Sequence, residues 1–154
     1  MKQQILNLAK TFFFERPGKR AGLDTLKTKL QNSQTKLETR FATAVGSDKD
    51  AKTLRHIIAI ERWGQRRLRV ASGEPLLEDE NHAYKPAADT SWQDLKGQFS
   101  QTRTDTLQLA NELTGQESVR VPHNDFGPMT VLGWLAYLNS HANLEAKRIR
   151  SESR

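Results

Sequence analysis

The positions of the five prolines constrain the fold of this chain more than any other feature of its sequence. They stand at residues 17, 75, 86, 122 and 128 and leave long intervals without proline between them. Because the interior of a helix tolerates proline least of all residues, these intervals show where helices can run. We expect four main helices, over approximately 22–44, 48–73, 90–115 and 128–149.

Apolar side chains recur at helical spacing within these intervals, which supports the prediction. The first interval carries one stripe with steps of three, four and seven residues, made of Leu23, Leu26, Leu30, Leu37 and Phe41. Ser47 and Asp50 resemble a capping box at the start of the second helix. Near the N-terminus, Ile5, Ala9, Phe12 and Phe13 predict a short extra helix that stops at Arg16-Pro17-Gly18.

The loops between these helices complete the predicted architecture. No stretch alternates apolar and polar residues well enough to predict a strand, so we expect an all-α four-helix bundle that forms a single domain over residues 1–154. The first two helices are joined by few residues and should be antiparallel neighbours. The links at about 73–89 and 115–128 are longer, and such links usually cross a bundle or line a site.

Composition excludes several classes of function. The chain has no cysteine, so any thiol chemistry needs a small-molecule thiol. Its apolar stretches are too short to cross a membrane, the N-terminus lacks a secretory pattern, and we expect a cytoplasmic protein without a membrane partner. The net charge of +6 raises the alternative of nucleic-acid binding. However, glutamates are mixed in with the basic runs at 62–69 and 147–154: Glu61 and Glu145 stand just before them and Glu152 lies within the second, which favours solvated helix faces.

Three polar side chains are predicted to face the interior of the bundle. On the last helix, the stripe of Val131, Leu135 and Leu138 leads by further steps of three and four to His141 and Glu145. His56 lies on the second helix, which is apolar over much of its circumference. An imidazole and a carboxylate four residues apart on a helix can hold one ion.

Burial of these three groups requires something that compensates for their lost hydration. A divalent cation is one solution, since two histidines and a carboxylate suit iron, zinc, nickel or manganese and leave coordination positions open. The other solution is an internal network of hydrogen bonds, in which Glu145 pairs with His141, Arg148 or Arg55. The spacing of the residues leaves both open.

The remaining histidines and tryptophans are assigned simpler roles. His82 and His123 fall in the long links and are predicted to be solvated. Because His123 precedes the last helix, the alternative for it is a place at a pocket mouth as a proton shuttle. Trp63, Trp92 and Trp134 are spaced as core residues.

The run Phe12-Phe13-Phe14 bears on assembly. One helix face cannot bury three consecutive aromatic rings within a monomer. We expect at least one of them to contact a partner chain or the long links, and this makes a homodimer the expected assembly.

Two segments resemble the DinB-like (DinB/YfiT) superfamily. They are Leu54 to Trp63, with the sequence LRHIIAIERW, and Phe126 to Leu135, with the sequence FGPMTVLGWL, followed by His141. The resemblance extends from about Leu23 to Ile149. It implies a four-helix bundle with long crossover links and a metal held by three histidines, one from the second helix and two, four residues apart, from the last. His56 and His141 match two of these positions, and Glu145 replaces the third histidine.

The resemblance implies a divalent-metal-dependent enzyme, similar to transferases and isomerases that use low-molecular-weight thiols. In that case His56, His141 and Glu145 are the ligands of zinc, nickel, iron or manganese. The alternative is a metal-free binding or structural bundle in which the glutamate marks a degenerate site. The substrate is not encoded in any pattern that we find, and no catalytic residue is assigned.

Overall fold

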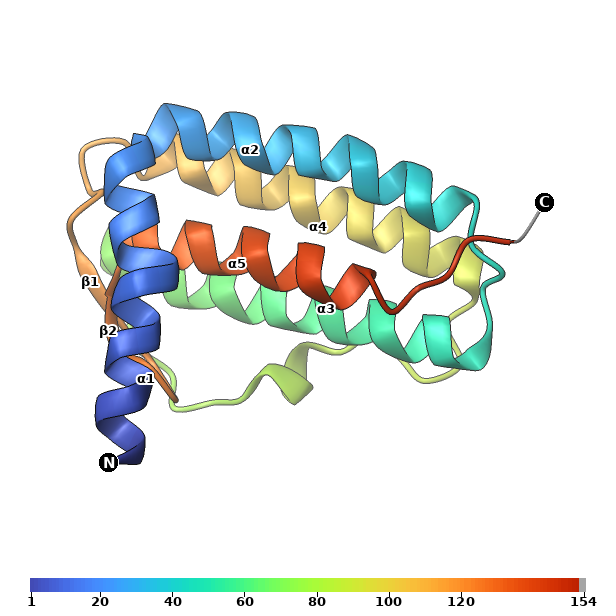
Figure 1. Cartoon of the computed structure of the whole chain (residues 1–154), viewed down its shortest axis with the longest axis horizontal. Helices are drawn as coiled ribbons and strands as arrows, with labels where there is room; N and C mark the ends of the chain where they lie inside the picture. Colours follow the sequence, from blue (N-terminus) through green and yellow to red (C-terminus); the bar gives the residue numbers. More distant parts are fainter. Residues whose placement is uncertain (153–154) are drawn as a thin grey trace.

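Helices make up most of the part of the chain that the computed structural model describes, residues 1–152. The α-helices are α1 (Lys2–Lys10), α2 (Arg16–Ala42), α3 (Asp48–Leu68), α4 (Trp92–Glu112) and α5 (Val131–Ala146). The last four form the predicted bundle, and α1 extends from one end of it (Figure 1). No helix in this part of the chain combines the length and the apolar character needed to cross a membrane.

The order of the helices around the bundle differs in one respect from the prediction. Both α2 and α3 pack against α4 and α5, so α2 and α3 lie diagonally opposite each other. They run in opposite directions, as predicted, but they are not neighbours (Figure 1). The reason is geometric: residues 43–47 are enough to cross the end of the bundle on its diagonal, so a short link does not require adjacent helices.

The N-terminal helix does not stop at Arg16-Pro17-Gly18, and this prediction was wrong. A π-helical turn, η1 (Thr11–Glu15), follows α1 and leads directly into α2. Pro17 is the second residue of α2, where its missing N–H group is tolerated. The helix breaks instead at Gly22, whose φ of 75° is accessible mainly to glycine.

A small antiparallel hairpin contradicts the expectation that the chain has no strand. Strand β1 (Arg120–His123) pairs with β2 (Gly127–Thr130), and Pro122 lies opposite Pro128. The sheet has two strands, so each strand has one unpaired edge, and proline, which cannot donate a ladder hydrogen bond, is tolerated in such edge strands. Strands of four residues that contain proline carry too little alternation to be recognised from sequence.

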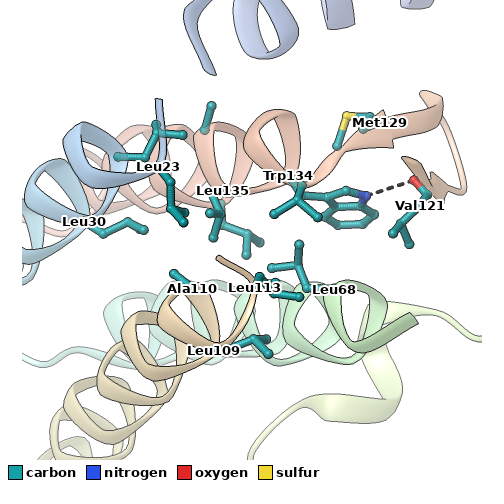
Figure 2. Close-up of a cluster of buried hydrophobic side chains, with 14 of the residues drawn as sticks. Leu23, Leu30, Leu68, Leu109, Ala110, Leu113, Val121, Met129, Trp134 and Leu135 are labelled. Carbon is teal, nitrogen blue, oxygen red and sulfur yellow. Dashed lines mark hydrogen bonds between the residues drawn. The ribbon is translucent and has the colours of Figure 1, made fainter. Parts of the chain in front are cut away.

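The core continues from the bundle into this hairpin. Figure 2 shows Leu23 and Leu30 of α2, Leu135 of α5 and Leu109 of α4 around one cluster. At its end the indole of Trp134 donates a hydrogen bond of 3.0 Å to the carbonyl oxygen of Val121 in β1 (Figure 2). Trp63 and Trp134 are core residues as predicted, whereas Trp92 is only partly buried.

One ion pair lies inside the bundle, between α3 and α4. The guanidinium of Arg103 donates to both carboxylate oxygens of Glu61, at 2.7 and 3.0 Å, and both side chains are at least 98% buried. Thr106 donates a further hydrogen bond of 2.8 Å to Glu61, and Arg103 also donates to the carbonyl oxygen of Leu30. This network fixes the register of α3 against α4.

The long link between α3 and α4 is held to the bundle at Asp79. Its carboxylate accepts hydrogen bonds from the indole of Trp63 and from the hydroxyl of Tyr84, and lies 3.5 Å from the guanidinium of Arg67. The buried Arg67 also donates to Asn124, so the two long links meet here. Asp79 therefore fixes the path of the chain beside α3.

Candidate metal centre

Helix α3 supplies His56 to the candidate centre. The helix begins at the predicted capping box, in which the hydroxyl of Ser47 accepts from the backbone N–H of Asp50 and the Asp50 carboxylate accepts from that of Ser47. Two turns further on, His56 is half-buried beside the fully buried Ile57 and Ile58. The packing of these neighbours holds α3 in place and directs His56 toward α5.

Helix α5 supplies His141 and Glu145. Its first turn is capped by Thr130, whose hydroxyl accepts from the N–H of Gly133, and the carboxylate of Glu15 accepts two hydrogen bonds from Thr130. The predicted apolar stripe is buried, and the continuation of its face brings His141 and Glu145 to the side of α5 that meets α3. Glu15, at the end of η1, thus helps to set the position of the metal-ligand candidates.

The three predicted site residues come together. The Nε2 atoms of His56 and His141 lie 3.1 Å apart, and their ring centroids are separated by 5.0 Å. One ligand atom from each of His56, His141 and Glu145 can be chosen so that all three lie within 4.8 Å of one another. The prediction that the two rings approach within about 10 Å, the spacing of a packed helix pair, is confirmed.

Electrostatics keep both imidazoles neutral at physiological pH. The pKa of His141 is lowered to about 3, mainly by burial and to a smaller extent by His56 and Arg148. Burial also lowers the pKa of His56; the nearby Glu145 acts in the opposite direction, while Lys85 and Arg148 add to the lowering. A neutral imidazole offers a lone pair, which is the form that binds a metal.

Glu145 has a protein partner in this structure. Its carboxylate lies 3.1 Å from the guanidinium of Arg148, one turn further along the chain, and the Glu145 side chain is 19% exposed. Of the network partners considered from the sequence, Arg148 is the one that the structure places there. Because the Arg148 side chain is 67% exposed, its charge is largely screened by solvent and can move away from Glu145.

An aromatic wall continues from His141 along α5. The ring of Tyr137 lies 6.0 Å from that of His141 and contacts Phe14 and Phe126 edge to face, at 5.3 and 5.9 Å. Phe14 also contacts Phe126, which belongs to the second long link, at 5.5 Å. The expectation that one of the three consecutive phenylalanines contacts a long link is therefore confirmed by Phe14.

His123 is the residue near the centre that sequence reasoning misplaced. It lies in β1 and is only 4% exposed, with Trp63, Trp134 and Tyr137 each at 5.0 Å, whereas a solvated loop position was predicted. His123 lies two residues after the buried Val121 on the same face of β1, but no sequence signal marks this strand, because Pro122 hides it. His82, by contrast, is exposed as predicted.

The hydrogen bonds of His123 define its protonation. Its Nδ1 accepts from the backbone N–H groups of Asp125 and Phe126, at 3.1 and 3.3 Å, so the proton of the neutral ring is on Nε2. Within the described residues Nε2 has no hydrogen-bond partner. Burial lowers the pKa of His123 to about 4, with a smaller opposing effect of Asp125 and a lowering effect of Arg67. A neutral ring with this pKa is a poor proton shuttle at neutral pH.

Comparison with known proteins gives one match. The model of the DinB superfamily matches residues 29–145, which include the whole of α3 and all three candidate ligands. No curated protein and no solved structure gives a significant match. The family match covers well over half of the sequence and agrees with the helical bundle described above. This chain belongs to the DinB superfamily.

Proposed function

We propose that His56, His141 and Glu145 bind one divalent transition-metal ion, and that the protein is a thiol-dependent, transferase-like enzyme. The observation that carries the proposal is the distance of 3.1 Å between the two Nε2 atoms. Two nitrogens that each lie about 2.1 Å from one ion are separated by about 3.0–3.4 Å at the bond angles of octahedral and tetrahedral sites. The imidazoles need little movement to share an ion.

The residues around the centre suit this role. A bound ion would supply the positive charge that keeps a small-molecule thiol deprotonated, and hence nucleophilic, at neutral pH. The chain has no cysteine that would compete for the ion. The Glu145 carboxylate offsets one unit of the ion's charge, which favours zinc, iron or manganese over softer ions. Tyr137, which packs against Phe126, lies beside His141 and makes that side of the centre apolar.

The second candidate function is a metal-free binding or structural bundle. It is favoured by the fact that each of the three groups already has a partner: the histidine rings share a hydrogen bond, and Glu145 pairs with Arg148. Nucleic-acid binding has less support. Arg67 is buried, Arg62 donates to Thr102 and Gln98, and Arg154 of the second basic run lies outside the described residues.

Elemental analysis of protein purified without chelators separates the two candidates. We expect near-stoichiometric zinc, nickel, iron or manganese in the wild type, and its loss in His141→Ala and Glu145→Ala. Arg148→Ala is the matched control, because it removes the ion-pair partner of Glu145 but no ligand, and it should retain the metal. At a free metal concentration of about 100 times Kd, the metal should raise the free energy of unfolding by ~2.7 kcal/mol.

The opposite result is equally clear. If the wild type takes up no ion when all four metals are supplied, and Glu145→Ala and Arg148→Ala lower the melting temperature equally with and without chelator, Glu145 is a network residue. The thiol-dependent activity would then be abandoned in favour of the metal-free bundle. Glu145→His provides an independent check. It restores the three-histidine set, and the variant should bind metal if His56 and His141 are placed to share one ion.

A further inference from the structure

Exposed apolar side chains gather on two segments of the surface. Seven of the ten large hydrophobic residues that are exposed in the described structure lie either in the N-terminal arm, which we define as residues 1–21, or in the acidic link, which we define as residues 74–80. In the arm they are Met1, Ile5, Leu8, Phe12 and Phe13, and in the link they are Leu76 and Leu77. None of these seven side chains belongs to the candidate metal centre.

The arm presents an apolar stripe without a partner. Met1, Ile5, Leu8 and Phe12 follow one another at steps of four, three and four residues, the spacing of a helix face that packs against another element. These four side chains are 61–95% exposed, and α1 has no buried residue. The stripe is therefore an apolar helix face that nothing in the described structure covers.

The arm is also strongly basic. It carries Lys2, Lys10, Arg16, Lys19 and Arg20 against one carboxylate, Glu15, which is already bound to Thr130. At the end of the stripe, Phe12, Arg16, Arg20 and Lys29 line a groove of about 400 Å³ that contains no acidic side chain. The arm therefore suits a partner that offers apolar side chains next to free carboxylates.

The acidic link has the complementary chemistry. Its sequence, Glu-Pro-Leu-Leu-Glu-Asp-Glu, places Leu76 and Leu77, which are 42% and 45% exposed, between acidic residues. Glu74 pairs with Arg66 and Asp79 with Arg67, but Glu78 and Glu80 are exposed and form no ion pair within residues 1–152. The contacts of Asp79 with the bundle thus hold two leucines and two free carboxylates at the surface.

We propose that a second copy of this chain covers the arm, with the acidic link of each copy docked on the N-terminal arm of the other. A two-fold axis makes the same contact twice, which is the usual route to a closed dimer. In Figure 1, α1 extends beyond the bundle on the side where the link runs below α3, so both segments are available on that side. A membrane of anionic lipids is the competing occupant of the arm, but Glu78 and Glu80 would be repelled by it.

Charge reversal tests this contact directly. One variant carries Arg16→Glu and Arg20→Glu, and the other carries Glu78→Lys and Glu80→Lys. Each variant alone places like charges at both contacts of the dimer, and its dissociation constant should rise at least about tenfold over that of the wild type. An equimolar mixture should dimerise again, because in the heterodimer one contact is wild-type and the other has both signs reversed. Analytical ultracentrifugation over a concentration series measures all three.

The control variant reverses two exposed charges elsewhere, Lys36→Glu and Lys49→Glu, and should dimerise as the wild type does. Circular dichroism verifies that each variant is folded. The proposal is overturned if the wild type stays monomeric at all concentrations, if either variant dimerises as well as the wild type, or if the mixture fails to dimerise. Binding of a monomeric wild type to vesicles of anionic phospholipid would assign the arm to a membrane surface instead.

Discussion

The burial of His123 has a measurable effect on how stability depends on pH. The folded protein holds this ring neutral, with a pKa of about 4, whereas in the unfolded chain the pKa is at its ordinary value of 6.5. Between these two values the unfolded chain binds the proton and the folded protein does not. The contribution of His123 to stability is therefore complete above pH ~6.5 and is lost as the pH falls toward ~4.

The size of the effect follows from the pKa difference. At pH ~5 protonation of the unfolded chain at this one residue should lower the free energy of unfolding by ~2 kcal/mol, and by ~3 kcal/mol once the pH is below both values. Other histidines also titrate, so the wild type must be compared with a variant. In His123→Asn the amide oxygen can still accept from the N–H groups of Asp125 and Phe126, but the titrating ring is gone.

Urea denaturation at pH ~7.5, ~6 and ~5 measures the difference. The variant should be less stable than the wild type at the highest pH, because a smaller side chain leaves a void among Trp63, Trp134 and Tyr137. Its free energy of unfolding should then fall less steeply than that of the wild type as the pH decreases. The difference between the two proteins should therefore be smaller by ~2 kcal/mol at pH ~5 than at the highest pH. Parallel curves for the two proteins would show that the burial of His123 does not control its ionisation, and would refute the reasoning.

Two further predictions concern the packing of the bundle and are checked by the same denaturation assay at neutral pH. Arg103→Met leaves the buried Glu61 without its ion-pair partner and should lower the free energy of unfolding by ~3–5 kcal/mol. Adding Glu61→Leu should recover most of this loss, and no recovery in the double variant would contradict this account. Gly18→Ala should cost ~1–3 kcal/mol because the new Cβ would lie 2.7 Å from the carbonyl oxygen of Leu132. Gly97→Ala, with nothing within 4 Å of the new Cβ, should instead stabilise α4 by up to ~1 kcal/mol, and the reasoning fails if both alanines act in the same direction.

The helices and the candidate centre were predictable because they depend on short-range periodicity. The stripe from Leu23 to Phe41 is buried along its whole length, and the capping box at Ser47 forms as its spacing indicated. The approach of His56 to His141 was predictable for a related reason. Each lies on an apolar helix face, and apolar faces meet at the axis of a bundle.

The features that escaped prediction depend on contacts between distant parts of the chain. Glu61 and Arg103 are 42 residues apart, and neither spacing nor composition distinguishes them from the exposed charges around them. The burial of His123 depends on a hairpin whose prolines hide its strands. Pro17 does not end the helix, because the π-helical turn η1 comes before it, and such a turn has no recognisable sequence pattern.

The diagonal placement of α2 and α3 bears on how the chain folds during its synthesis. These two helices are made before α4 and α5, yet they have few contacts with each other, so the native structure contains no helical hairpin that they could form early. Their apolar faces stay uncovered until α4, which packs against both, has been made. Such long-range contacts slow folding and prolong the exposure of aggregation-prone intermediates. His141 and Glu145 lie on α5, so the two halves of the candidate centre meet only after all four helices of the bundle have been made.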